Sequence, residues 1–190
     1  ERGVALFASS AEGVSIESRR MMDLHSAGSI RLDGVPAADI VWLTGDDVEG
    51  GIQQTFDQAT IVLAAEMMGS AREVLERTVA HLGEREQFDV KLGTFQALQH
   101  RCAHMYCDLE LAESAVLAAL TALDHAAPNV SLLASSAKAL ANDCFTLISS
   151  EAVQLHGGMG VTEEMDIGLF LKRSRCLLYT SDAADEVLGV

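Results

Sequence analysis

The sequence predicts a mainly α-helical protein, an up-and-down four-helix bundle preceded by a small partial antiparallel β segment. Up to residue 48, short apolar runs alternate with turn signals, as they do in strands. After an acidic, glycine-rich connection, the apolar residues recur every three or four positions, as they do in helices. We therefore divide the chain into a β segment, residues 1–48, a helical bundle, residues 49–175, and a tail, residues 176–190.

Four short strands are expected in the β segment, at residues 4–7, 14–16, 30–32 and 40–43. A turn signal, Asp33-Gly34, follows the third of them. So small a sheet has few partners to pack against, so we expect further strands in the complete protein. The chain opens at Glu1 directly on a strand, which suggests a piece cut from something longer.

The first two helices are long. Apolar residues line one face of the first over residues 56–74, and Gly83 ends it. The second has Thr94 as its expected N-cap and ends before Pro128, which breaks the chain. Helices of roughly 30 residues joined by short connections are typical of an up-and-down bundle.

The third helix is expected to stop at His156 and the short fourth to run from its N-cap, Thr162, to about Arg175. Apolar residues cover more than one face of the first helix, as Ile61 and Leu63 show. A helix that is apolar over so wide an arc needs neighbours on two sides. We therefore expect a large exposed apolar surface that a second subunit and further domains cover.

Composition and charge exclude two kinds of partner. Hydrophobic residues make up 49% of the 190 residues, enough for a real core. The net charge of −15 repels phosphate backbones, so no nucleic-acid partner is expected. No apolar run of about 18 residues occurs, so no membrane span is expected. The four cysteines lack a CxxC spacing, which favours free thiols in a reducing cytoplasm.

Three glycines within four residues, Gly157, Gly158 and Gly160, follow the third helix. A helix stop explains one of them. The others indicate bare backbone that a ligand can approach, next to amides that could bind an anion. Gln154 lies one turn earlier and could join them.

A second cluster of side chains could bind a metal ion. His100, His104 and Cys107 share one helix face, with a spacing that could hold zinc. They also fit an ordinary half-buried helix, and no second ligand cluster accompanies them. We assign no metal site.

Three motifs occur in order on these helices: R-x-x-F at residues 85–88, F-Q-x-x-Q at residues 95–99 and Q-x-x-G-G-x-G at residues 154–160. Through them, and through residues 32–36, the chain resembles the acyl-CoA dehydrogenase family over about residues 1–175. The sequence of residues 153–166 is most similar to that of bacterial members, including small subunits of pimeloyl-CoA-type dehydrogenases.

The resemblance implies a fold and an activity. The family has an N-terminal helical domain, a central β-domain and a C-terminal four-helix bundle, so residues 1–48 would end the β-domain. Its members are oxidoreductases of fatty acid metabolism that oxidise acyl-CoA to 2,3-enoyl-CoA with FAD. A carboxylate removes the α-proton while the β-hydrogen leaves as hydride to the flavin. The implied partners are acyl-CoA, an electron-transferring flavoprotein and further subunits of a homo- or hetero-oligomer, a dimer or tetramer.

The resemblance also implies site residues. An arginine on the FAD phosphates suits the chemistry, because its fork matches two oxygens. The glutamine and glycines of the third motif would line the FAD of the partner subunit. Asp57 matches an aspartate that touches the CoA arm, although Thr60 stands where the family usually has an arginine. The implied cofactor residues are Arg85, Gln87, Phe88, Gln96, Gln154, Gly157 and Gly158.

No catalytic base is assigned. The two positions that the family uses fall near Ser181 and on Ala59, and neither offers a carboxylate. The leading hypothesis is a fragment of an FAD-dependent acyl-CoA dehydrogenase that is inactive alone. The alternatives are a non-catalytic subunit of a heteromeric dehydrogenase and a stand-alone helical binding or metal protein. Because the resemblance stops abruptly at Cys176, we expect residues 176–190 to be foreign and to pack poorly.

Overall fold

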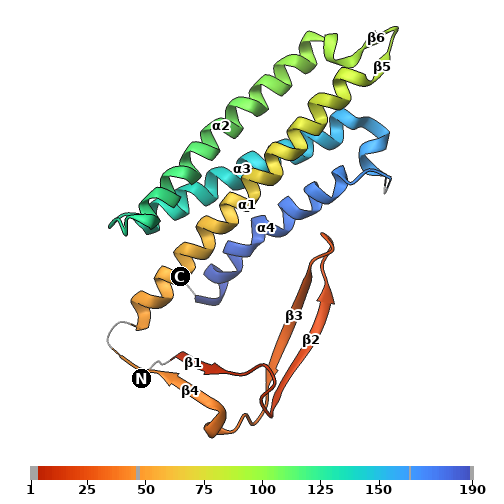
Figure 1. Ribbon diagram of the computed structural model, residues 1–190. Helices are drawn as coiled ribbons and strands as arrows, with labels where there is room; N and C mark the ends of the chain where they lie inside the picture. Colours follow the sequence, from red (N-terminus) through yellow and green to blue (C-terminus); the bar gives the residue numbers. More distant parts are fainter. Residues whose placement is uncertain (1–3, 46–47, 163, 189–190) are drawn as a thin grey trace. The chain divides into compact units, whose positions relative to one another are not determined.

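The computed structural model describes residues 4–45, 48–162 and 164–188, with side chains described up to residue 178 (Figure 1). The chain forms two compact units, residues 1–56 and residues 57–190. It is mainly helical, with four α-helices and short antiparallel strands near the N-terminus among the described residues. The predicted fold class is therefore confirmed.

The first unit contains two strand pairs. β1 (Val4–Phe7) pairs antiparallel with β4 (Ile40–Leu43), and β2 (Val14–Arg20) pairs antiparallel with β3 (Ser26–Leu32). All four predicted strands are present. The β2–β3 hairpin is longer than predicted because its outer half is polar and exposed, so no apolar alternation marks it.

The first unit has one turn that requires glycine and an exposed tryptophan. Gly13 has a φ of 81°, and a Cβ there would lie 2.4 Å from the carbonyl oxygen of Asp33, so only glycine fits this turn. Trp42 on β4 leaves 58% of its surface exposed.

The second unit is built on four helices. They are α1 (Val48–Glu84), which begins in the first unit, α2 (Gln96–Asp124), α3 (Val130–His156) and α4 (Ile167–Leu188). Their core is one cluster of buried apolar side chains drawn from all four helices. The largest fully buried apolar side chains are Phe145, Ile61, Met67, Met105, Leu109 and Ile148.

A hairpin that the sequence did not predict joins α1 to α2. Its strands are β5 (Glu86–Gln87) and β6 (Val90–Lys91), followed by the 3-10 turn η2 (Leu92–Thr94). The two loop residues, Phe88 and Asp89, have φ values of 59° and 63°. A two-residue loop of this conformation matches the twist of the strands, and aspartate tolerates it better than most residues do.

Both predicted threonine caps are wrong. The Thr94 hydroxyl donates to the Lys91 carbonyl at 2.7 Å, and Phe95 takes the N-cap position of α2. The Thr162 hydroxyl donates to the Met159 carbonyl at 2.8 Å and closes the 3-10 turn η3 (Gly157–Val161). Each threonine bonds to the backbone behind it, which competes with capping the helix ahead.

The fourth helix also ends later than predicted. It continues past Arg175 to Leu188, and Leu177 is only 3% exposed. The Leu177 carbonyl accepts a hydrogen bond of 3.0 Å from the ammonium of Lys138 on α3, itself buried. The expectation that the helix stops at Arg175 rested on a break in resemblance, which carries no information about helix propensity or burial.

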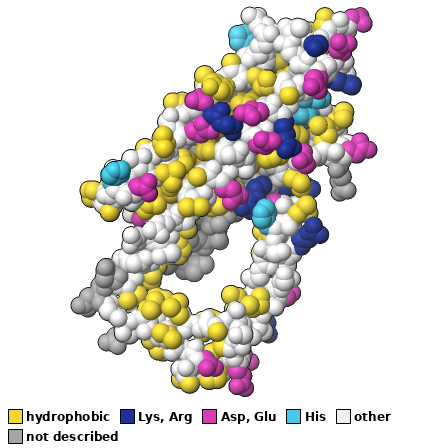
Figure 2. Space-filling model, in the orientation of Figure 1, with side chains coloured by type: hydrophobic (Ala, Val, Ile, Leu, Met, Phe, Trp, Pro, Cys, Tyr) yellow, Lys and Arg dark blue, Asp and Glu magenta, His cyan; other side chains and the backbone are white. Residues whose placement is uncertain are grey.

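Large apolar side chains are exposed on the three long helices, and the large apolar surface stays a prediction. Figure 2 shows hydrophobic atoms, in yellow, at the surface of the bundle. Among the described helices, none is long and apolar enough to cross a membrane. The most exposed of these side chains are Leu132, Leu111, Leu117 and Val62, each more than half exposed.

Candidate cofactor site

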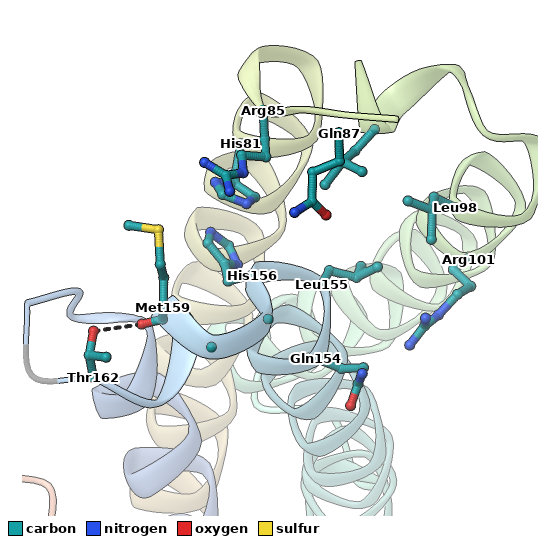
Figure 3. A pocket seen from close by; sticks show the side chains of 13 residues that line it. His81, Arg85, Gln87, Leu98, Arg101, Gln154, Leu155, His156, Met159 and Thr162 are labelled. Carbon is teal, nitrogen blue, oxygen red and sulfur yellow. Dashed lines mark hydrogen bonds between the residues drawn. The ribbon is translucent and has the colours of Figure 1, made fainter. Parts of the chain in front are cut away.

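A cavity of about 600 Å³ opens at one end of the bundle (Figure 3). The end of α1, the β5–β6 hairpin, the start of α2, the end of α3 and the η3 turn surround it. Cavities of this size are common for small-molecule and cofactor sites. The lining residues are His81, Arg85, Gln87, Leu92, Leu98, Arg101, Gln154, Leu155, His156, Gly157, Gly158, Met159 and Thr162.

Residues from two of the three motifs meet in this cavity. Arg85 and Gln87 come from the first motif, and Gln154, Gly157 and Gly158 come from the third. The resemblance implies that both sets face the FAD of a partner subunit, so it does not require them to meet within one chain. This proximity cannot be read from the sequence, because it depends on where α1 and α3 end.

Phe88 and Gln96 do not line the cavity. Phe88 stands at the hairpin tip with 82% of its surface exposed, and its ring contacts Phe95 edge-on with centroids 6.3 Å apart. Gln96 is exposed in the first turn of α2. The second glutamine of that motif, Gln99, donates from Nε2 to the Gly93 carbonyl at 2.8 Å and so holds the turn before the helix.

The three glycines of the third motif have different reasons to be glycine. Gly157 ends α3 with a φ of 62°. A Cβ on Gly160 would lie 2.6 Å from the Val153 carbonyl oxygen, so this turn requires close backbone approach. A Cβ on Gly158 would meet nothing within 4 Å, and its φ is not positive. Only Gly158 lacks a structural reason, and it faces the cavity.

The cavity is electropositive in an acidic protein. Among the described residues, no carboxylate lines it, whereas two arginines do. Arg85 is exposed and forms no ion pair with a described residue. Arg101 donates from Nε to the Glu151 carboxylate at 2.6 Å. This lining suits an anionic ligand better than a cationic one.

Two histidines that the sequence did not single out lie beside these cations. The rings of His81 and His156 stack with centroids 4.3 Å apart and planes 24° from parallel (Figure 3). Burial, the facing His156 and the nearby Arg85 lower the pKa of His81 below its usual 6.5. The motif at residues 154–160 contains His156, but the stacked partner comes from a helix turn that carries no motif.

The other predicted positions lie away from the cavity. Asp57 is buried on α1, where its carboxylate accepts a hydrogen bond from the Ser131 hydroxyl of α3. Ala59 is exposed on α1. Ser181 lies on α4, but its side chain is outside the described part of the structure. The resemblance implies two positions for a catalytic base, and the one on α1 is occupied by Ala59, which has no carboxylate.

Within the described residues, no three His, Cys, Asp or Glu side chains gather closely enough to hold a metal ion. His104 instead approaches Asp108, with 3.3 Å between Nδ1 and the carboxylate. None of the four cysteines forms a disulfide in the described part of the structure.

Comparison with known proteins gives a consistent result. Residues 50–181 match the family described as acyl-CoA dehydrogenase, C-terminal domain, so the resemblance continues past Arg175. The acyl-CoA dehydrogenase IpdE2 of Mycolicibacterium smegmatis is 38% identical over 130 residues, which cover 68% of this chain and 38% of that protein.

Solved structures share the fold over nearly the whole chain. A variant of the steroid ACAD Tcur3481-Tcur3483 is 31% identical with a TM-score of 0.84, covering 98% of this chain and 50% of that one. A chain from a structure of the electron transferring flavoprotein of Acidaminococcus fermentans is 26% identical with a TM-score of 0.82, covering 90% and 46%. This chain thus spans half or less of each protein that it matches here.

Proposed function

This chain belongs to the acyl-CoA dehydrogenase family, and from that premise we propose that it is part of an FAD-dependent enzyme that oxidises acyl-CoA to 2,3-enoyl-CoA. In that reaction an α-proton passes to a carboxylate and a β-hydride to FAD, leaving a Cα–Cβ double bond. FAD supplies the hydride acceptor when bound. The activity is proposed for the complete protein, of which this chain covers a part.

The cavity at the end of the bundle carries the cofactor proposal. The diphosphate of FAD needs cationic and N–H donors, and the cavity offers Arg85 without a described carboxylate partner. Gln87 and Gln154 add neutral amide donors from the hairpin and from α3. Gly158 leaves backbone that a ligand can approach closely. These residues fit a phosphate-bearing part of the cofactor.

Phe88 and Gln96 have a different proposed role. Both are exposed outside the cavity, and Phe88 projects from a hairpin tip. An aromatic ring so exposed gains most from a partner surface. We assign both residues to FAD across a subunit interface, where a two-fold dimer would bring a second chain against them.

The remaining roles follow from the same premise. Asp57 stays our proposal for a contact to the CoA arm, although its carboxylate already serves Ser131. An electron-transferring flavoprotein is the proposed electron acceptor, and homologous or different subunits are the proposed partners. None of the described cysteines forms a disulfide. A cytoplasmic location is part of the same proposal.

A non-catalytic subunit of a heteromeric dehydrogenase is the second candidate. The observation that favours it is Ala59, which stands where a carboxylate would act as base. In that case this chain would supply FAD contacts and an interface, while another subunit supplies the base. Dye-linked activity of the complete protein, alone and with candidate partner subunits, separates the two candidates.

Titration of this chain with FAD, followed by flavin fluorescence, tests the cavity. We expect weak binding that Arg85→Ala reduces at least tenfold, because a charged hydrogen bond contributes about 1.5–3 kcal/mol. Arg175→Ala is the matched control, because Arg175 is an exposed arginine that does not line the cavity. Equal affinity of Arg85→Ala and the unaltered chain would remove the cavity from the proposal.

A further inference from the structure

The stacked histidines stand on the two helices that end at the cavity. His81 lies in the last turn of α1, and His156 is the last residue of α3. His156 is 5% exposed, and its Nδ1 lies 2.8 Å from the Ala152 carbonyl. Because a carbonyl oxygen only accepts, Nδ1 carries a hydrogen, and Nε2 is left to take up or release a proton.

Burial and the charges around His81 oppose its protonation. Arg85 at the end of α1 and Arg101 from α2 line the same cavity. The carboxylate of Glu84 favours a higher pKa for His81. The carboxylate of Glu151 on α3 already accepts a hydrogen bond from Arg101. The η3 turn contributes no charged side chain. A proton on either ring thus adds positive charge beside Arg85, unless an anion enters the cavity.

We propose that His81 and His156 are anion-binding groups of this cavity, which take up protons when a diphosphate binds, so that affinity for FAD rises as the pH falls. The inference rests on the proposed cofactor site. An anion that prefers the protonated rings must bind more tightly wherever protonation is more complete, by thermodynamic linkage. The histidines would thereby place positive charge beside Arg85 mainly when the diphosphate is bound.

The test is FAD affinity measured between about pH 5.5 and 8, the range in which histidine changes charge. FAD and ADP-ribose both carry a diphosphate diester whose charge is constant over this range, so the ligands do not titrate. We expect about tenfold tighter binding at the lower pH, equivalent to one unit of histidine pKa change. NMR titration of the imidazole Cε1 protons should show both rings gaining protons on addition of ADP-ribose.

Two variants and a control assign the effect. His81→Gln keeps a polar side chain without the charge, and His81→Phe keeps a ring to stack on His156. Both should flatten the pH dependence, with a larger loss of affinity at pH 5.5 than at pH 8. His125→Gln is the control, because His125 lies at the other end of α2, outside the cavity, and its ring Nδ1 contacts the Thr121 carbonyl. Circular dichroism confirms that each variant is folded.

The outcomes separate the inference from the proposal beneath it. FAD binding with a flat pH profile would overturn the inference and leave the cofactor site standing. A full pH dependence in folded His81→Gln and His81→Phe would also overturn it. Failure of FAD and ADP-ribose to bind at any pH would overturn both the inference and the assignment of the cavity.

Discussion

The guanidinium of Arg101 on α2 donates from Nε to a carboxylate oxygen of Glu151 on α3 over 2.6 Å. Arg101 lines the cavity and Glu151 does not. Glu151 therefore ties two helices together and, at the same time, offsets one of the two arginine charges of the cavity. This division leaves Arg85 as the dominant cation there.

Glu151→Gln is expected to tighten FAD binding about two- to fivefold, because it releases the charge of Arg101. That range corresponds to the 0.5–1 kcal/mol of a half-exposed charge interaction. Glu110→Gln is the matched control, since Glu110 accepts from Arg72 across α1 and α2 outside the cavity. Fluorescence titration of both variants decides the matter, and weaker binding by Glu151→Gln would contradict it.

The three glycines should separate in an alanine series. Gly160→Ala should destabilise the fold by about 1–3 kcal/mol, because its Cβ meets the Val153 carbonyl at 2.6 Å. Gly157→Ala should cost a similar amount through its backbone φ of 62°. Gly158→Ala should leave stability within about 0.5 kcal/mol and weaken FAD binding instead. Urea unfolding and FAD titration measure the two effects independently.

A pair of shortened chains tests how far α4 belongs to the bundle. A chain ending at Leu178 keeps the buried Leu177 and its carbonyl contact with Lys138, whereas one ending at Arg175 loses both. We expect the shorter chain to be less stable by about 2 kcal/mol. Equal midpoints of urea unfolding would show that the contacts beyond Arg175 do not stabilise the bundle.

His81 should make stability depend on pH. Its pKa in the folded protein lies below its usual 6.5, so below that value the unfolded chain binds more protons. The free energy of unfolding should therefore rise with pH between the lowered pKa and 6.5, and the penalty should be absent above 6.5. His81→Phe should flatten this dependence and His125→Gln should not, as urea unfolding at several pH values would reveal.

The chain alone is expected to show no acyl-CoA oxidation. Ala59 offers no carboxylate, and loss of a general base typically removes roughly 10²–10⁴-fold of rate. A dye-linked assay with acyl-CoA substrates and added FAD measures it. Measurable turnover by these 190 residues would contradict the expectation.

The sequence predicted the helices because their apolar residues repeat over many turns, as on α1. The β5–β6 hairpin and the turns at the two threonines were not predicted, because each depends on the interactions of a few atoms. The hairpin at Phe88 and Asp89 is set by two left-handed residues with no glycine to announce them. Thr94 and Thr162 carry the residue type of a cap but bond backwards. Local propensity does not choose between two such bonds.

The cofactor residues stay a prediction. The first and third motifs name Arg85, Gln154 and Gly158, but their meeting in one cavity depends on where two helices end. His81 carries no motif, and only the packing of α1 against the end of α3 places it on His156. Contacts between segments that are far apart in the sequence depend on how the helices pack, and no local sequence pattern predicts them.

Trp42 gives the two units separate optical signals. It is the single tryptophan of the chain and lies on β4, paired with Ala5 of β1. Its emission therefore follows the strand unit, while ellipticity at far-ultraviolet wavelengths follows the helices. Denaturation curves recorded by the two probes would coincide if both units melt in one cooperative step and would diverge if the strands melt first. An ordinary fluorimeter can thus monitor the small unit inside a protein whose bulk is helical.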